Sequence, residues 1–238
     1  MHSTIRVALI GDFNEHQKAH LAISRSLASA SDDSVESVWV ATDSVGRGDL
    51  LDQFQGIWCV PGMPYRNADG AIRAIRHARV TRTPFLGTSA GFQYALVEYA
   101  RNALGLAEAD HQKSNPKCGI PLISPLDRAM AGARGRVHFM DGTIIRKAYG
   151  GKESVEEYHC SFGLNPKYRR LLEGSQFWVA GVDDQHDIRA FELDGHPFFV
   201  ATLFQPEMRV NEGTASPLVS AFVHACAKHH MGMTSAAR

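Results

Sequence analysis

The sequence lacks the features that mark several large classes of protein. Its 25 lysines and arginines balance its 25 aspartates and glutamates, so no charge excess favours nucleic acid or an anionic membrane as a partner. No apolar run approaches the roughly 20 residues of a membrane span, and no signal-peptide hydrophobic region follows the N-terminus. No phosphate-binding loop of the form G-x-x-x-x-G-K-[ST] occurs either. We therefore expect neither nucleic acid nor a membrane as a partner.

Patterns that form disulfides or metal sites are also scarce. Only four cysteines occur, at positions 59, 118, 160 and 226, and no two of them form a C-x-x-C pair. We interpret them as buried or free thiols of a cytoplasmic protein. His16 and His20 stand four residues apart, as metal ligands can, but no third ligand follows at suitable spacing, which favours a solvated helix face. We expect no metal and no other cofactor.

What is present is an alternation of apolar runs and amphipathic segments. Continuous apolar runs, typical of strands covered on both faces, predict strands at 7–10, 38–40, 56–60 and 84–87. The spacing of apolar residues predicts helices at 15–30 and 68–80, and a third helix that starts after Gly87 and runs through Arg101. This order predicts an α/β fold with a doubly wound, mostly parallel sheet, helices on both faces and ligand sites at the carboxyl ends of the strands.

The pattern changes after Gly105. Residues 107–135 are polar and contain proline and glycine, so we interpret them as a long loop over the sheet edge. A hairpin is predicted from 136–139 and 143–145, joined at Asp141-Gly142. Strands at 177–180, 188–192 and 198–202 are expected to form a mixed or antiparallel extension. A helix at 216–228 closes a single domain of residues 1–230, and residues 231–238 are predicted to be a disordered tail.

The sequence Gly87-Thr88-Ser89-Ala90-Gly91 stands between the fourth predicted strand and its helix, and it fits the G-x-S-x-G turn. Small residues on both sides allow a strand to reverse sharply into a helix. The turning side chain, here Ser89, then stands at the carboxyl end of the strand, facing the free N–H groups of the helix. Such a position suits a nucleophile and the anion that its attack creates.

Several further segments carry a resemblance to a known family. They are Thr-Pro-Phe-Leu-Gly at 83–87, the run 97–106, Lys-Ala-Tyr-Gly at 147–150, Asn-Pro-Lys-Tyr at 165–168, and the run 196–202. From residue 7 to about 227 the chain resembles the class I glutamine amidotransferases, most of all the glutaminase domains of CTP synthases. The resemblance implies a flavodoxin-like α/β fold. It also suggests a glutaminase-type domain that stands alone, because the amidoligase part precedes this domain in the full synthases.

The resemblance implies hydrolysis of glutamine by a cysteine, a histidine and a glutamate, but two of the three matched positions differ. The nucleophile position holds Ser89, and the final His-Pro-Glu motif reads Gln205-Pro206-Glu207. A serine hydroxyl is almost un-ionised near neutrality and needs an adjacent base, whereas the Gln205 amide has no basic nitrogen. Glu207 remains without an imidazole to orient at position 205. The triad is degenerate, and we expect glutamine hydrolysis to be lost.

The substrate-binding positions that the resemblance implies have changed too. The family's acidic residue for the glutamine ammonium aligns with Lys113, and the arginine-containing segment for the glutamine carboxylate reads Glu156-Glu157-Tyr158-His159-Cys160-Ser161-Phe162. Lys113 would repel an ammonium, and Glu156 and Glu157 stand where basic residues are usual. We therefore predict a pocket of reversed polarity, whose ligand presents an anionic group to Lys113.

Other substrate contacts are retained. The backbone N–H groups of Gly62, Met63 and Ala90 can still cradle an anion. Gln93 matches a family position that contacts substrate, and Gln205 is expected beside it. These residues, with Lys113, form the predicted substrate-binding set.

The Ser89 turn has a second, shorter likeness. Residues 87–91 are similar to the nucleophile turn of cyanophycinase and the aspartyl dipeptidases, which share the general fold and use serine. These enzymes need a histidine, and His111, His138 and His159 are the candidates here. His159 is the preferred one, because it lies in the segment that the family brings over the active site. The predicted catalytic residues are therefore Ser89, His159 and Glu207.

Three functions remain open at this point. The first is a serine-dependent hydrolase or lyase acting on a small amide, amine or ester other than glutamine. The second is a catalytically inert protein that binds a small molecule or regulates a partner. The third is a glutaminase subunit of a CTP synthase-like ligase, with a separate synthase subunit as its partner. A homodimer is also left open, and we do not expect this chain alone to make CTP.

Overall fold

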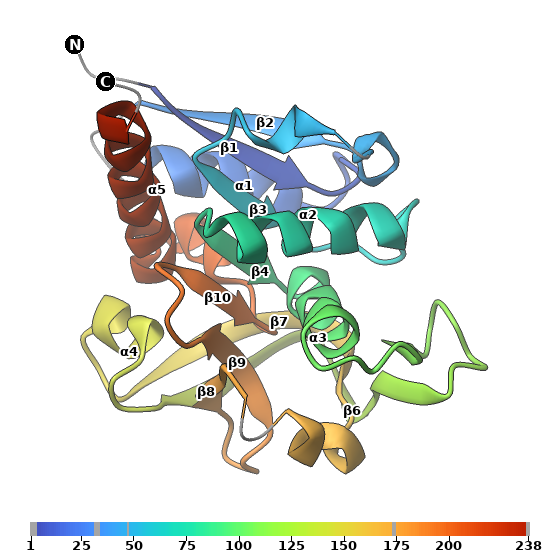
Figure 1. Ribbon diagram of the computed structural model, residues 1–238. Helices are drawn as coiled ribbons and strands as arrows, with labels where there is room; N and C mark the ends of the chain where they lie inside the picture. Colours follow the sequence, from blue (N-terminus) through green and yellow to red (C-terminus); the bar gives the residue numbers. More distant parts are fainter. Residues whose placement is uncertain (1–3, 31–33, 47, 173–174, 237–238) are drawn as a thin grey trace.

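The computed structural model describes residues 4–30, 34–46, 48–172 and 175–236, with side chains through residue 232. These residues form a single sheet of ten strands with helices on both of its faces (Figure 1). The sheet is parallel in its first half and antiparallel in its second half, which confirms the predicted fold class.

The first half of the chain builds the parallel part of the sheet. Its strands are β1 (Ile5–Ile10), β2 (Val35–Val40), β3 (Gly56–Cys59) and β4 (Phe85–Thr88). The helices that follow them are α1 (Lys18–Ala28), α2 (Ala68–Thr81) and α3 (Ala90–Asn102), with short 3-10 turns η1 (Thr42–Ser44) and η2 (Asp49–Leu51). α2 and α3 pack together on one face, whereas α1 packs with α5 (Pro217–Ala236) on the other.

The second half of the chain extends the sheet. β10 (Phe199–Thr202) lies parallel to β4, β9 (Ile188–Leu193) pairs antiparallel with β10, and β8 (Phe177–Val182) pairs antiparallel with β9. Next come β6 (Ile120–Phe139), β5 (Ala109–His111) and β7 (Glu153–Leu164), so the strand order is β2-β1-β3-β4-β10-β9-β8-β6-β5, with β7 paired to β6. Two 3-10 helices, η3 (Pro166–Leu171) and η4 (Pro206–Glu212), follow β7 and β10.

The core lies between the sheet and its helices. Leu9, Trp58 and Phe85 of the central strands are fully buried, as expected for strands covered on both faces. The rings of Phe85 and Phe199 stack across the β4–β10 pair with their centroids 4.3 Å apart. Because β3, β4 and β10 are parallel, their carboxyl ends lie together at one edge of the sheet.

The prediction of a long loop over residues 107–135 is wrong. Most of this segment belongs to β6, which forms a long antiparallel ribbon with β7, a strand that the sequence pattern did not reveal. The middle of β6 is exposed or half-buried along its length. This part of β6 therefore has no need of the apolar alternation by which a strand is recognised. β7 does bury one face, at Glu156, Tyr158 and Cys160, but a glutamate at a buried position hides the alternation.

The predicted strand at 143–145 is also wrong, because α4 (Ile144–Tyr149) begins there. Thr143 caps the helix by accepting the N–H of Arg146, and the Glu192 carboxylate accepts the N–H groups of Ile144 and Ile145 at 2.8 Å each. Glu192 comes from β9, so part of the cap is a tertiary contact. Side-chain oxygens that satisfy the first free N–H groups stabilise the start of a helix.

Two of the predicted helices have different bounds in the structure. The first helix is shorter than predicted, and α5 continues beyond 228 to Ala236, past the predicted start of the disordered tail. Residues 237–238 of that tail lie outside the described residues. In the described part of the chain, no helix is long and apolar enough to cross a membrane, and the four cysteines are free thiols.

Candidate functional site

Ser89 lies at the turn from β4 into α3, as predicted. Its backbone has φ 53° and ψ −102°, a conformation that few non-glycine residues adopt. The Ser89 N–H donates to the Thr202 carbonyl of β10 at 2.9 Å, which holds the strained turn against the neighbouring strand. Gly91 is needed because a Cβ there would lie 2.0 Å from the Cys59 carbonyl oxygen.

A cavity of about 540 Å³ opens at this edge of the sheet, in the size range of small-molecule sites. Seven of the nine predicted site residues line it, namely Ser89, His159, Gly62, Met63, Gln93, Lys113 and Gln205. The other two, Ala90 and Glu207, do not. Residues from five separate segments of the chain are therefore brought together around the cavity. No hydrogen bond to Ser89 Oγ is formed by any described residue.

Gln205 and Glu207 lie where the chain passes from β10 into η4. Gln205 is 3% exposed, and its Oε1 has no hydrogen-bond partner among the described residues; both carboxyl oxygens of the fully buried Glu207 also lack one. Burial raises the pKa of Glu207 to about 8. A carboxyl with this pKa is mostly protonated at neutral pH, so it is a poor base there.

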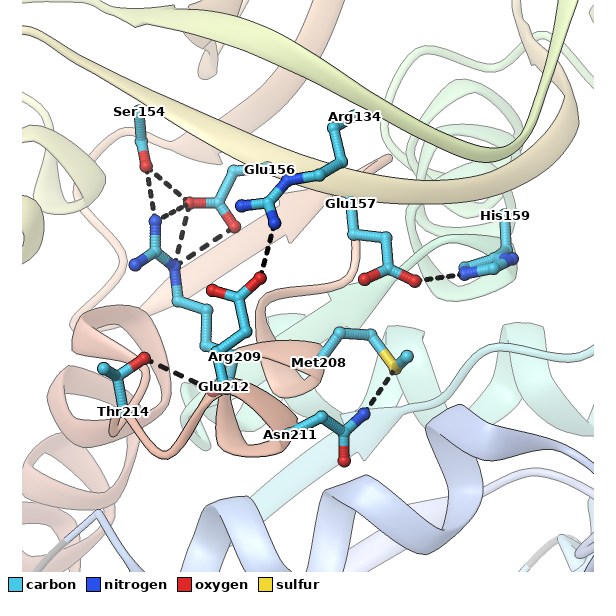
Figure 2. A network of polar contacts seen from close by, with 10 residues as sticks. All are labelled: Arg134, Ser154, Glu156, Glu157, His159, Met208, Arg209, Asn211, Glu212 and Thr214. Carbon is cyan, nitrogen blue, oxygen red and sulfur yellow. Dashed lines mark hydrogen bonds and ion pairs between the residues drawn. The ribbon is translucent and has the colours of Figure 1, made fainter.

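His159 of β7 carries a carboxylate partner that the sequence did not suggest. Its Nε2 lies 2.5 Å from Oε1 of Glu157, two residues earlier on the same strand (Figure 2). Residues i and i+2 of a strand point to the same face, which is why these two side chains meet. The Nε2 proton then donates to the carboxylate, and Nδ1 is left as the basic nitrogen. In the sequence, the spacing Glu-x-His at 157–159 is the pattern that could have indicated this pair.

The other two candidate histidines do not serve as bases in the cavity. His111 is buried, its Nδ1 accepts the Lys113 N–H at 3.1 Å, and its Nε2 donates to Gln93 Oε1 at 3.0 Å. Burial lowers the pKa of His111 to about 4. His138 lies outside the cavity and contacts Asp184 Oδ1 at 2.7 Å. His111 instead fixes the Gln93 amide, whose Nε2 donates to the Phe162 carbonyl.

The two charged positions behind the predicted reversal of polarity lie in different places. Lys113 lines the cavity, with its Nζ 5.9 Å from the centre of the Phe162 ring. Glu156 does not, because its carboxylate is buried and accepts from Arg209 Nη2 at 2.7 Å, as Figure 2 shows. Ser154 joins this pair, accepting from Arg209 and donating to Glu156. The network ties η4, and with it Gln205, to β7.

His20 is a second residue that the sequence reading missed. It is 1% exposed, whereas we predicted a solvated helix face for His16 and His20; His16 is exposed but lies before α1 begins at Lys18. His20 Nδ1 accepts the Asn14 N–H, and its Nε2 donates to the Pro61 carbonyl at 2.7 Å. This contact holds the turn at Gly62, whose φ of 128° requires glycine.

The backbone around the cavity offers unpaired donors. The N–H groups of Gly62, Met63 and Ala90 find no acceptor within the described residues. Neither α1 nor α3 has a side-chain cap or an acidic residue in its first turn. Described residues contain no group of three or more His, Cys, Asp or Glu side chains that could hold a metal ion. The chemistry available is therefore a serine hydroxyl, an imidazole and backbone N–H groups.

A strained elbow at the carboxyl edge of a mostly parallel sheet, beside a turn rich in free N–H groups, defines a glutamine amidotransferase-like site. The family model for glutamine amidotransferase class-I matches residues 16–225. The chain belongs to the class I glutamine amidotransferase family.

Within this family the chain is similar to CTP synthases. It is 32% identical over 241 residues to the CTP synthase of Saccharolobus solfataricus and 33% identical over 235 residues to that of Herpetosiphon aurantiacus. These alignments cover 94% and 92% of this chain but 45% and 44% of the relatives. The chain therefore spans a little less than half the length of the curated relatives it matches.

Solved structures show the same fold. The glutaminase domain of Trypanosoma brucei CTPS with bound acivicin has a TM-score of 0.84 at 21% identity, covering 94% of each chain. A glutamine amidotransferase from Thermotoga maritima has a TM-score of 0.57 at 10% identity, covering 95% of this chain and 98% of the other. The first of these likenesses extends the relation to CTP synthases from sequence to architecture.

Proposed function

We propose that this chain is a CTP synthase-type amidotransferase homologue that no longer hydrolyses glutamine and acts through Ser89 on another small amide or ester. One observation carries the proposal: Ser89 opens into the same cavity as His159, whose imidazole is held by Glu157. A nucleophile, a base and a group that orients the base are the parts that acyl transfer needs. Here the nucleophile Ser89 directly follows β4, and the base His159 and its partner Glu157 belong to β7.

The proposed reaction uses these groups in order. His159 Nδ1 takes the Ser89 hydroxyl proton as Oγ attacks the acyl carbon, and the Glu157 carboxylate stabilises the imidazolium that forms. The N–H groups of the Pro61–Met63 turn and of α3 stabilise the oxyanion. The imidazolium then protonates the leaving amine or alcohol, and water, deprotonated by His159, releases the acid from Ser89.

The base that the family uses is missing, and the cavity wall, in the part of the chain that the structure describes, lacks a carboxylate to hold the ammonium of glutamine. Gln205 has no basic nitrogen, and Glu207 is buried with a pKa raised by burial to about 8, so neither accepts a proton readily near neutral pH. No aspartate or glutamate stands among the described residues that line the cavity. An ammonium group would therefore meet Lys113 without a carboxylate to hold it.

The same features favour a ligand with an anionic group. The Lys113 ammonium has no carboxylate within ion-pair distance among the described residues, and it faces the cavity beside Phe162. A charge-assisted contact to a carboxylate or phosphate of the ligand would be worth on the order of 1.5–3 kcal/mol. We therefore place the substrate among small anionic amides and esters.

A catalytically inert binding protein is the second candidate. The observation that favours it is that Ser89 Oγ makes no hydrogen bond to His159 or to any other described residue. The half-length match to the CTP synthases also makes a separate synthase or ligase subunit a partner to test. That partner would support a binding or regulatory role even without chemistry at Ser89.

A substrate screen tests the proposal. The protein is incubated at neutral pH with matched sets of small amides and esters that carry an anionic, a neutral or a cationic group, and products are followed by NMR. We expect turnover of anionic members that disappears in Ser89→Ala. Turnover that persists in Ser89→Ala contradicts the role of Ser89. Binding of anions without any turnover favours the inert protein.

A further inference from the structure

The turn that carries two of the proposed oxyanion donors is held by residues outside the cavity wall. Gly62 and Met63 line the cavity, and their N–H groups find no acceptor among the described residues. Backbone N–H groups stabilise a developing oxyanion only when they are already aimed at the place where it forms. The contacts that fix the direction of these N–H groups therefore decide what the turn can do.

His20 of α1 contacts the first residue of this turn. It is 1% exposed, and its Nε2 lies 2.7 Å from the Pro61 carbonyl oxygen. Its Nδ1 lies 3.0 Å from the backbone nitrogen of Asn14, which can only donate. Because Nδ1 must accept that hydrogen bond, the ring proton is on Nε2 and is donated to Pro61. The Trp39 ring packs against the imidazole with the centroids 4.8 Å apart, which restrains the ring plane.

The surroundings of His20 also favour the neutral ring that this pair of hydrogen bonds requires. Burial lowers the pKa of His20 below its usual value, although the Pro61 carbonyl and the Asp12 carboxylate each raise it. A protonated ring would carry a second N–H, on Nδ1, facing the Asn14 N–H. Protonation of His20 would therefore break the contact with Asn14 that fixes the ring.

The hydrogen bond to Pro61 sets the direction of the next N–H group. The Pro61–Gly62 peptide unit is trans and planar, so its carbonyl oxygen and the Gly62 N–H point in opposite directions. His20 does not line the cavity, whereas Gly62 does. A carbonyl held toward His20 therefore turns the Gly62 N–H to the side away from His20.

The other end of the turn is attached to Asp12, which follows β1. The Asp12 carboxylate accepts the Arg66 N–H at 2.7 Å and the Thr42 N–H at 3.0 Å, and Arg66 Nε lies 3.2 Å from it. Thr42 Oγ1 accepts the Asn67 N–H at 3.0 Å. With this end of the segment fixed, the orientation of the Pro61 carbonyl at the other end depends on His20.

We propose that His20 is a positioning residue of the Ser89 site, whose neutral ring holds the Pro61 carbonyl and thereby aims the Gly62 N–H at the oxyanion. His20 acts only through the Pro61–Gly62 peptide. This inference rests on the proposed function for the reaction that it affects. An oxyanion donor is used in the transition state, so loss of His20 should lower kcat and leave KM nearly unchanged.

The kinetic test compares His20→Phe and His20→Gln with the parent on the best substrate from the screen. Phenylalanine keeps a ring but removes both hydrogen bonds, whereas glutamine keeps an N–H donor that can reach Pro61. His196→Phe is the matched control, because His196 Nε2 lies 3.1 Å from the Ala78 carbonyl and its Nδ1 accepts the Phe198 N–H, outside the cavity wall.

We expect His20→Phe to lower kcat by about 10²-fold, the loss that follows removal of one oxyanion donor. KM should be nearly unchanged. His20→Gln should retain more activity than His20→Phe, because it can still hold the Pro61 carbonyl. His196→Phe should change neither constant, although it loses the same two kinds of hydrogen bond.

NMR tests the same contact without any turnover. The chemical shifts of the ring nitrogens of His20 identify which of them carries the proton, and this measurement needs no variant. The residual dipolar coupling of the Gly62 N–H reports the direction of that bond. We expect a proton on Nε2 alone at neutral pH, and a Gly62 coupling that changes in His20→Phe but not in His196→Phe.

A His20 ring protonated on Nδ1, or a Gly62 coupling that His20→Phe leaves unchanged, overturns the positioning role. So does a kcat that His20→Phe leaves unchanged or that His196→Phe lowers equally. The two proposals fail separately. If the parent turns over no substrate while the NMR results are as expected, the catalytic proposal fails and the hold of His20 on the turn stands. Ser89-dependent turnover at full rate in His20→Phe sinks this inference alone.

Discussion

Glu157 Oε1 lies 2.5 Å from Nε2 of His159, and the imidazole stands on the wall of the cavity into which Ser89 opens. The pair occupies successive same-side positions of β7. In the proposed reaction the pair supplies the base that position 205 cannot, because an amide stands there. The arrangement leads to separate predictions for the base, the substrate, the support of the site and its pH dependence.

Replacing the proposed base, His159, should lower kcat more than replacing its partner, Glu157. We expect His159→Gln to lower Ser89-dependent kcat by about 10²–10⁴-fold, the range of general base catalysis. Glu157→Gln should lower it less, because the imidazole remains but is no longer held by a charge. The measurement is kcat on the best substrate from the screen. Glu153→Gln, which removes an exposed carboxylate of the same strand paired with Arg136, is the control. Unchanged kcat in His159→Gln would exclude this base.

Glutamine should not be hydrolysed. Ammonia release from glutamine is expected at background in the parent, because Lys113 repels the substrate ammonium and no carboxylate among the described residues lines the cavity to hold it. The informative variant is Ser89→Cys with Gln205→His. If ammonia release remains absent there, Lys113 and the missing arginine of the segment 156–162 become the cause. Ammonia release by the parent that is lost in Ser89→Ala would refute the prediction.

The ion pair of Arg209 with the buried Glu156 should stabilise the fold around the site. Arg209→Ala leaves the Glu156 carboxylate, whose side chain is 1% exposed, without its cation. We expect a loss of about 3–5 kcal/mol in the free energy of unfolding, measured by urea denaturation. Arg134→Ala is the matched control, because its ion pair with Glu212 also ties η4 to the ribbon but is exposed. Exposed pairs are worth about 0–1 kcal/mol, and equal losses in the two variants would contradict this account.

Glu207 should make the protein less stable as pH rises. Burial raises its pKa from 4.5 to about 8 on folding, so between these values the folded state holds a proton that the unfolded state has released. The stability that the protonated carboxyl provides is complete below pH 4.5 and is lost as the pH rises through about 8. Glu207→Gln should therefore stabilise the protein more at about pH 9 than at about pH 5.

The measurement for Glu207 is the difference in unfolding free energy between parent and variant at each pH. Taking the difference cancels the buried histidines, of which His111 and His196 have pKa values lowered by burial to about 4 and act in the opposite direction. A difference that is the same at both pH values would show that Glu207 does not titrate in this range.

The sequence was sufficient for the parallel half of the fold, because fully buried strands such as β1 and β4 are continuous apolar runs. It was also sufficient for the Ser89 elbow, since Gly87 and Gly91 are required by close contacts that leave a local pattern. It failed for β6, whose middle buries little, and for β7, whose buried face includes the charged residue Glu156. It failed again at residues 144–145, where Glu192 from a distant strand completes the helix cap.

The site was predicted where single positions decide the chemistry and missed where partners come from folding. Ser89, Lys113 and Gln205 could be named from their positions alone. The burial of His20 against Pro61 and the capture of Glu156 by Arg209 depend on η4 and α1 packing beside the cavity. Neither contact leaves a sequence pattern, because the partners are about 40 and 50 residues apart along the chain.

The central claim is that Ser89 is a nucleophile in a cavity that selects anionic acyl groups. The most direct test is the reaction with the mono-p-nitrophenyl ester of glutaric acid, followed by p-nitrophenol release and by intact-protein mass spectrometry, with the neutral p-nitrophenyl pentanoate as control. We predict release of p-nitrophenol that is lost in Ser89→Ala and is faster than from the pentanoate, with a glutaryl group mapped to Ser89 in samples quenched with acid during the reaction. Release of p-nitrophenol that persists in Ser89→Ala, no release by the parent, or equal rates for the two esters would contradict the claim.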